Sequence, residues 1–378
     1  MRFVPLTLIL TALPALTSAQ ETALTVALGK DTVALERYTR SATRMTGEVV
    51  SRFGAAGNRI QYDITIANGR PVSMVYRPRP LTAAPAPTAA REIKITFVGD
   101  SVRREAVFAD STNTRMLPAA HGVPYLYPAF GLLEIAFAEL RKTRAAAMTV
   151  ATVGLGTNNP GTITITPGRA DTVTVVSAGG FVLVFRVDPE GKVLEVDGSR
   201  TTQKVLAKRG ANNAELDALA ARMTPIGQLS GRGLANGSFI QSVVFLSYGR
   251  PLVRGRTVWG GLLVPPDTIW RLGANEATHI ATSRELTFGT VVVPPGLYTL
   301  WLFNGKTAPQ LVINRQVGQW GTSYDPAQDL GRVPVTFSAT PEHVEEFTIT
   351  VRNTGQGRGA LEFAWGSQMA TAAFTVRP

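Results

Sequence analysis

Residues 60–76 read IQYDITIANGRPVSMVY, and this stretch decides the fold class. Apolar residues occupy every second position of residues 60–66, which is the period of a strand that buries one face. Asn68-Gly69 follows, a strong short signal for a two-residue hairpin turn, and the alternation then resumes. The stretch therefore predicts a β-hairpin within a β-rich domain.

One segment beyond this hairpin has helical periodicity. After a loop rich in Pro and Ala at residues 78–90 and further strand patterns, Pro128 suits the first position of a helix. Glu134 and Glu139 lie off the apolar stripe of this helix, which consists of Phe130, Leu133, Phe137 and Leu140. We expect the stripe to pack on the sheet.

The pattern along the chain divides it into two domains. An α+β domain, an antiparallel sheet with one packed helix, is predicted over residues 20–223 and ends in a short helix at 213–223. Residues 224–239 are rich in Gly and are interpreted as a linker. Nine short strand patterns between turn signals predict an antiparallel β-sandwich over residues 240–378.

The composition limits the classes of function. The 378 residues are 44% hydrophobic and 17% charged, which is typical of a globular protein. The net charge of +11 comes mostly from scattered Arg residues, so we expect a basic surface that attracts anionic envelope polymers and no nucleic-acid partner. With no Cys, the chain has no disulfides, thiol nucleophiles or Cys metal ligands.

The N-terminus has the pattern of a cleavable signal peptide. Arg2 precedes an apolar stretch over residues 3–16, and Thr17-Ser18-Ala19 matches a cleavage site, so a mature chain is expected to begin at Gln20. We therefore expect export to the periplasm or the extracellular space. No later stretch is long and apolar enough for an integral membrane segment in the mature chain.

Five ordered motifs in the C-terminal part belong together. They are SYGRPLVRGRTVWGGLLVP at 247–265, WRLGANEAT at 270–278, PGLYTL at 295–300, QWG at 319–321 and Tyr324-Asp325. Residues 240–378 resemble the bacterial domain-of-unknown-function 2911 family through these motifs. The resemblance implies an exported β-sandwich of uncharacterised activity. Arg254 stands where the family usually has a lysine-like residue, which is a mild departure.

The same motifs contain the candidate ligand-binding residues. Arg guanidinium groups suit carboxylate or phosphate, and Trp rings offer flat faces to sugars or cations. A polar and apolar cleft for a glycan or an anionic polymer is one interpretation. Its candidate residues are Arg250, Arg254, Arg256, Trp259, Trp270, Arg271, Asn275, Glu276, Trp320 and Tyr324.

Two other interpretations stay open. In a structural one, Arg271 pairs with Glu276 and the Trp residues belong to the core. In a catalytic one, the protein is an extracytoplasmic hydrolase that uses Glu276 with His279 or Asp325. The sequence contains no established catalytic or phosphate-binding motif, and its three His residues are widely spread, so we expect no cofactor and no metal.

Overall fold

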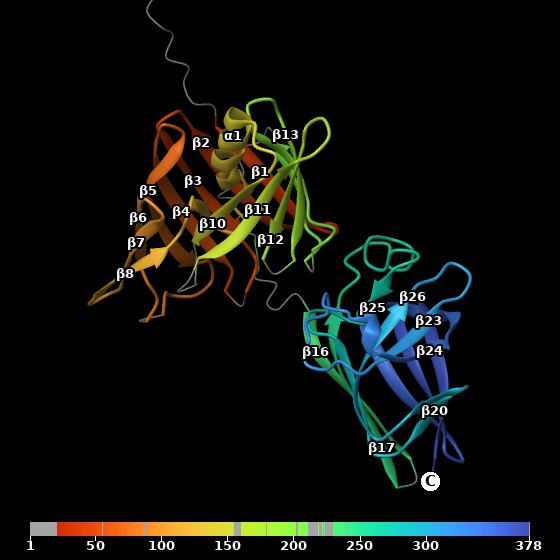
Figure 1. The fold of residues 1–378 in the computed structure, drawn as a ribbon. Coiled ribbons are helices and arrows are strands. Elements are labelled where there is room, and N and C mark those ends of the chain that lie inside the picture. The colour runs from red at the N-terminus through yellow and green to blue at the C-terminus, as the bar shows by residue number, and fades with distance from the viewer. Residues whose placement is uncertain are drawn as a thin grey trace, which may run out of the picture.

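The computed structural model describes residues 21–377 except 55, 87, 155–159, 179, 202, 211–217, 219–220, 222, 224–229 and 240. Two β-rich units follow each other along the chain, and each has its own apolar core (Figure 1). The predicted signal peptide and most of the helix predicted at 213–223 lie outside these described residues. Within them, no helix combines the length and the apolar character that crossing a bilayer requires.

The first unit is a single sheet of fifteen strands. Strands β1 to β8 are successive antiparallel neighbours, and β9 to β15 form a second series in which only β9 and β10 are parallel. The two series join where β1 pairs with β15. The strands are β1 (Thr22–Leu28), β2 (Asp31–Arg40), β3 (Arg44–Ser51), β4 (Asn58–Ala67), β5 (Arg70–Pro80), β6 (Glu92–Val98), β7 (Ser101–Val107), β8 (Thr112–Pro118), β9 (Val123–Tyr125), β10 (Met148–Gly154), β11 (Gly161–Pro167), β12 (Thr172–Ser177), β13 (Val182–Val187), β14 (Val193–Asp197) and β15 (Leu206–Gly210).

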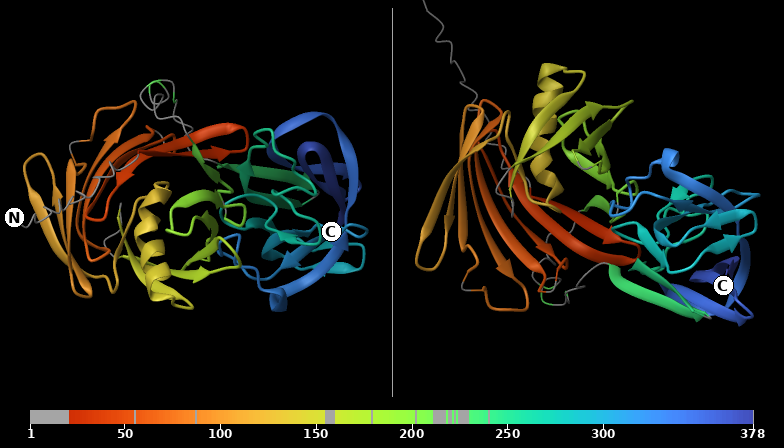
Figure 2. Two further views of the ribbon diagram at one scale, coloured as in Figure 1. Left: turned by 90° about the horizontal axis from the view of Figure 1, so that it is seen from above. Right: turned by 60° about the horizontal axis from the view of Figure 1, so that its bottom comes forward.

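The short connection between β8 and β9 forces this sheet to curl. These strands stand at opposite ends of the strand order, yet only residues 119–122 separate them. Such a connection spans at most roughly 18 Å, at about 3.6 Å per residue. The two ends of the sheet therefore lie near each other, and Figure 2 shows the sheet wrapping around α1 (Glu134–Thr143).

The helical segment supplies the centre of the first core. It starts with a 3-10 turn, η1 (Phe130–Leu133), so helical structure begins two residues later than Pro128, where the sequence predicted it. All four residues of the predicted apolar stripe are buried, and the rings of Phe130 and Phe137 pack edge-on against Phe185 of β13. The prediction of one helix packed on a β-sheet is confirmed.

A buried polar cluster fixes this helical segment to the sheet. Glu134 lies off the apolar stripe and is nevertheless buried, because its Oε1 accepts hydrogen bonds from three donors. These are Tyr38 Oη at 2.5 Å, Arg209 Nη2 at 2.6 Å and the backbone N–H of Val193 at 2.8 Å. A buried carboxylate needs such compensation, since an unpaired charge in the core is strongly destabilising.

Glu36 is the second carboxyl group of this cluster. Its Oε2 accepts a hydrogen bond from the Gly131 N–H at 2.8 Å, and its Oε1 lies 2.7 Å from Tyr62 Oη. Complete burial raises the pKa of Glu36 to about 8, and the neighbouring carboxylate of Glu134 acts in the same direction. Gly131 has no room for a side chain, because an added Cβ would overlap the Tyr38 ring.

The second unit is an antiparallel sandwich, as predicted. One sheet has the order β16-β17-β19-β22-β23-β24, with β18 paired to β22, and the other has the order β21-β20-β26-β25. A 3-10 turn, η2 (Pro326–Gln328), precedes β24. The strands are β16 (Ser230–Phe239), β17 (Ser242–Pro251), β18 (Ile269–Trp270), β19 (Thr278–Thr282), β20 (Leu286–Phe288), β21 (Val291–Val293), β22 (Gly296–Phe303), β23 (Gln310–Asn314), β24 (Asp329–Pro334), β25 (Thr336–Gly355) and β26 (Arg358–Val376).

The linker predicted over residues 224–239 is wrong for residues 230–239, which form β16. The glycines of this strand allow close packing. An added Cβ on Gly233 would meet the side chains of Tyr248 and Arg250 on the neighbouring strand, and one on Gly237 would meet Val351. The strand patterns near the C-terminus also merge, since the predicted strands at 361–365 and 372–376 are both parts of the long strand β26.

The raised pKa of Glu36 predicts a pH-dependent stability. A raised pKa in the folded state means that the folded chain holds a proton that the unfolded chain releases above its usual pKa of 4.5. The free energy of unfolding should therefore fall as pH rises from about 4.5 to about 8. In Glu36→Gln, which mimics the protonated acid, this fall should be smaller by on the order of 2–4 kcal/mol. Urea denaturation at a series of pH values from about 5 to about 9 measures the free energy of unfolding of both proteins.

Glu139→Gln is the matched control, because it makes the same substitution in the same unit at a Glu of α1 that is only half-buried. It should keep the pH dependence of the parent protein. An unchanged pH dependence in Glu36→Gln would show that Glu36 is ionised in the folded state at neutral pH.

Candidate functional site

The loop after β17, in the second unit, contacts the first unit. The backbone N–H of Lys30 donates to the carbonyl of Arg254 at 3.3 Å, and Arg254 Nη1 pairs with Asp31 Oδ2 at 3.0 Å. Gly29 in the β1–β2 turn has a φ of +63°, and an added Cβ there would overlap the Arg254 carbonyl. Figure 2 shows this β1–β2 hairpin reaching the C-terminal sandwich. The turn therefore docks closely on the Arg-containing loop.

A cavity of about 40 Å³ lies at this junction. That volume is roughly three times the 10–15 Å³ that one water needs. Both units line it, and three of the lining groups are cationic side chains in addition to Arg254. The lining residues are Leu28, Gln203, Lys204, Ser230, Pro251, Leu252, Arg254, Arg256, Leu263, Trp270, Arg271, Gly273, Ala274 and Trp365.

Three of these cations make no hydrogen bond or ion pair with a carboxylate among the described residues. Arg271 is only 8% exposed, and its one hydrogen bond runs from Nε to the Gly273 carbonyl at 3.4 Å. Arg256 donates to two backbone carbonyls of its own loop, at 3.0 and 2.7 Å, and Lys204 Nζ donates to the Ser199 carbonyl at 3.0 Å. The charges are therefore held in place by neutral acceptors.

The pKa values of these groups reflect their crowding. Burial lowers the pKa of Arg271 to about 10 and that of Arg256 to about 10. Arg254 adds to the effect on Arg256, and the carboxylates of Glu345 and Asp31 oppose it. Burial also lowers the pKa of Lys204 to about 8, and repulsion from Arg271 and Arg256 acts in the same direction. Desolvation and mutual repulsion thus disfavour the positive charges of these side chains, and a bound anion would reduce the repulsion.

Trp365 also lines the cavity. Its indole N–H is buried and has no hydrogen-bond partner, which is rare for a buried donor in a folded protein. The Lys and Arg side chains are also donors only. A ligand that supplies several acceptor atoms and negative charge therefore fits the chemistry of this cavity.

Of the ten predicted ligand residues, Arg254, Arg256, Trp270 and Arg271 line this cavity. Arg271 does not pair with Glu276, as the structural interpretation had it, because Glu276 Oε2 pairs with Arg232 Nη1 at 2.9 Å.

Two other candidates, Arg250 and Trp259, contact groups of the sandwich itself, and Trp270 packs in its core as well as lining the cavity. Arg250 pairs with Glu346 at 2.9 Å. Trp259 donates its indole N–H to the Trp365 carbonyl at 2.9 Å, and its ring packs edge-on against Trp270. Trp270 is also stacked on Trp365 with the ring centroids 5.5 Å apart. The rings of Trp259 and Trp270 thus form part of the aromatic core beside the cavity.

Asn275, Trp320 and Tyr324 lie outside the cavity lining. Asn275 Nδ2 lies 3.5 Å from the Ser230 carbonyl, and Trp320 forms a β-bridge with Glu276. Tyr324 donates to Asp329 at 2.7 Å, and burial, followed by this hydrogen bond, raises its pKa to about 12.

The groups of the hydrolase alternative are occupied by other partners. His279 Nε2 accepts a hydrogen bond from the Gly318 N–H at 2.9 Å, and burial lowers the pKa of His279. Asp325 accepts from the Ala327 N–H as the cap of η2, and Glu276 is held by Arg232. Glu276 is near enough to act on the charge of His279, but within the described ranges no hydrogen bond or ion pair joins His279 to a carboxylate. The same residues contain no cluster of potential metal ligands.

Sequence reasoning missed three groups at the junction. Lys204 and Asp31 belong to the other unit, and no local pattern connects them to an Arg-rich loop that lies far along the chain. Trp365 lies in β26, and its sequence neighbourhood shows only the pattern of a strand. The presence of unpaired donors can be read from the tertiary structure alone.

The sequence of the C-terminal unit matches a known family. The family described as "Protein of unknown function (DUF2911)" matches residues 233–374, which confirms the predicted resemblance of this part. The match begins inside β16, so it includes the strand that was predicted to be a linker. The comparison with curated proteins gives no match.

Two solved structures are similar to the chain at low identity. One is a DUF1089 family protein from Pseudomonas aeruginosa, with 11% identity and a TM-score of 0.33, covering 44% of this chain and 89% of that one. The other is a β-barrel-like protein of domain of unknown function DUF1849 from Brucella abortus, with 10% identity and a TM-score of 0.33, covering 50% of this chain and 94% of that one.

The packing predicts unequal roles for two Trp residues. Trp270→Ala should lower the free energy of unfolding of the C-terminal unit by about 3–5 kcal/mol, because it removes a large ring from a packed core. Trp320→Ala is the matched control, since Trp320 is 40% exposed, and it should change stability by less than about 1 kcal/mol. Chemical denaturation followed by tryptophan fluorescence measures both. Equal losses would contradict the assignment of Trp270 to the core.

Proposed function

We propose that this is an exported protein that binds a compact anionic group at the junction of its two units. The observation that carries the proposal is the convergence of Lys204, Arg256 and Arg271 on one cavity, with no carboxylate partner in the described part of the chain. Buried cations are normally paired, because desolvation of a charge is strongly unfavourable. An anion in the cavity supplies the missing partner.

The size and chemistry of the cavity define the ligand class. About 40 Å³ suits a single carboxylate, phosphate or sulfate group and excludes a whole sugar ring. Arg guanidinium groups favour such oxyanions because several N–H donors reach two oxygens at once. The group can be a free ion or a substituent of an anionic envelope polymer, which is the partner that the basic composition predicts.

Anion binding should appear as stabilisation by inorganic phosphate. At a free phosphate concentration of 100 times Kd, the free energy of unfolding should rise by about 2.7 kcal/mol, because only the folded chain forms the site. Arg271→Met should weaken phosphate binding by roughly 10- to 100-fold, the loss expected for a charged hydrogen-bonding group. Isothermal titration and thermal unfolding in phosphate, sulfate, acetate and chloride measure both effects.

Two features of this experiment separate binding from a structural role. Met keeps the packing of the Arg271 stem and removes an unpaired buried charge, so Arg271→Met should be as stable as the parent protein, or more so, without phosphate. Arg358→Met is the matched control, because it removes an exposed Arg outside the cavity lining. If Arg271→Met is less stable in every buffer and phosphate adds nothing to the parent protein, the residue is structural and the proposal fails.

Lys204 adds a pH dependence to the same titration. Its lowered pKa means that it loses its proton as pH rises through about 8, so phosphate affinity should fall above that pH. In Lys204→Arg the charge persists, and the fall should disappear. A titration with a polymeric polyphosphate beside inorganic phosphate then distinguishes a pendant group from a free ion.

The export part of the proposal rests on the N-terminal pattern alone. A chain expressed in a bacterium with a C-terminal tag should be recovered outside the cytoplasm, with a new N-terminus at Gln20, because the residues before it match a signal peptide. Cell fractionation and mass spectrometry of the intact chain measure this. Recovery of the uncleaved chain in the cytoplasm would contradict it, and a variant with Ala19→Arg should block cleavage.

A further inference from the structure

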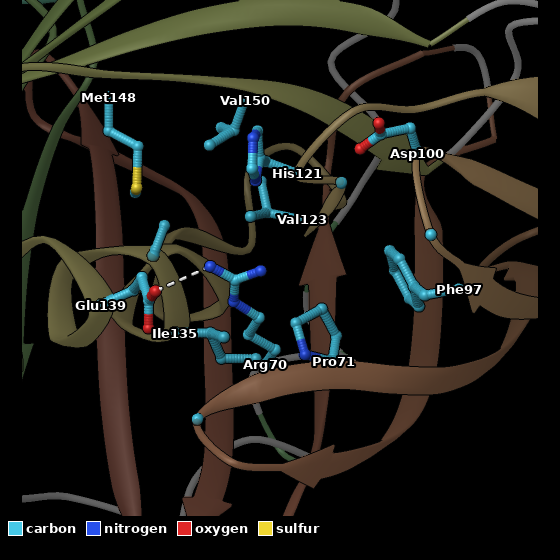
Figure 3. Close-up of a pocket in the computed structure, with 14 residues that line it drawn as sticks. Arg70, Pro71, Phe97, Asp100, His121, Val123, Ile135, Glu139, Met148 and Val150 are labelled. Atoms are coloured by element: carbon cyan, nitrogen blue, oxygen red, sulfur yellow. Dashed lines mark hydrogen bonds and ion pairs between the residues drawn. The ribbon is translucent and has the colours of Figure 1, made fainter. Parts of the chain in front are cut away.

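A second cavity, with a mostly apolar lining, lies in the first unit, away from the junction. It has a volume of about 200 Å³ and lies between α1, the β4–β5 turn, the β6–β7 turn and the connection from β8 to β9 (Figure 3). This is the place where the two ends of the curled sheet approach each other. The sheet does not close there, and α1 covers the opening from inside.

The floor of this cavity is aliphatic. Val123 of β9, Ile135 of α1 and Val150 of β10 are all buried, and Phe97 and Met148 form the walls. An engineered apolar cavity of about 150 Å³ stays dry and binds benzene. The space here is therefore suited to a short hydrocarbon chain, which contacts such a floor better than water does.

The rim of the cavity is polar and carries both signs of charge, since Asp100 and Glu139 line it together with Arg70 and His121. Arg70 Nη2 pairs with Glu139 Oε1 at 3.0 Å, so the β4–β5 turn is tied to the helix. In Figure 3 the Arg70 guanidinium lies beside Glu139, and the His121 ring lies across the space near Val150. His121 is exposed and makes no hydrogen bond or ion pair with its side chain among the described residues. The Glu139 contact leaves other Arg70 N–H groups available, because a guanidinium has five.

We propose that this cavity binds a short-chain aliphatic carboxylate. The hydrocarbon chain lies on Val123, Ile135 and Val150, and the carboxylate accepts hydrogen bonds from Arg70 and His121 at the rim. Arg70 then bridges the ligand and Glu139. This site uses none of the residues at the junction of the two units, so it is independent of the anion site proposed above.

The volume predicts a limit on chain length. Each methylene that enters an apolar site should raise affinity about fourfold, and the gain should stop when the cavity is full. Isothermal titration of the full chain with butanoate, hexanoate, octanoate and decanoate tests this. The chain carries Arg271→Met, so that carboxylate binding at the junction is weakened and contributes less to the signal. We expect affinity to rise along the series and then to level off.

Two variants locate the site. Ala136→Leu fills the cavity from the helix and should weaken octanoate binding at least tenfold, whereas Lys142→Leu, which adds the same side chain at an exposed position of that helix, should not. Arg70→Met should weaken octanoate binding but not 1-octanol binding, and Arg115→Met on exposed β8 should change neither. Circular dichroism checks that each variant folds.

Three outcomes would overturn the proposal. They are the absence of saturable octanoate binding, equal affinity in Ala136→Leu and the parent protein, and equal affinity for butanoate and octanoate. Equal losses of octanoate and 1-octanol binding in Arg70→Met would overturn the carboxylate assignment. None of these results bears on phosphate binding at Arg271, so the two sites are tested separately.

Discussion

The four-residue connection between β8 and β9 is the constraint on which the first unit depends. It brings the two ends of a fifteen-stranded sheet together, and so the sheet has to curl around something. The helical segment fills that space with Phe130 and Phe137, while Glu134 binds to groups on β2, β14 and β15. The cavity near His121 is the part of this interior that the helix leaves open.

Both units place polar groups in their interiors, and they balance them differently. In the first, the carboxyl groups of Glu36 and Glu134 are surrounded by Tyr hydroxyls, backbone N–H groups and an Arg, so each has partners. At the junction, Arg256 and Arg271 meet only carbonyl oxygens. The first cluster is balanced by its own groups, whereas the hydrogen-bond acceptors at Arg256 and Arg271 are neutral.

Much of the architecture could be predicted because it depends on local period. The alternation at residues 60–66 and the apolar stripe of the helix are both buried as their patterns predict. The patterns could not distinguish Trp270 from Trp320, since burial depends on which strands pack above a ring. The glycines of 230–239 misled for a related reason, because close packing and flexibility have the same sequence signature. Lys204 joins the site only through the docking of the two units.

That docking has a thermodynamic consequence. Lys204 comes from one unit and Arg271 from the other. The β1–β2 turn at Gly29 packs against Arg254 and so keeps these two side chains at the same cavity. A ligand that bridges them binds better to the docked arrangement than to a separated one. By reciprocity, docking must then raise the affinity for that ligand by the same factor as the ligand raises the docking equilibrium.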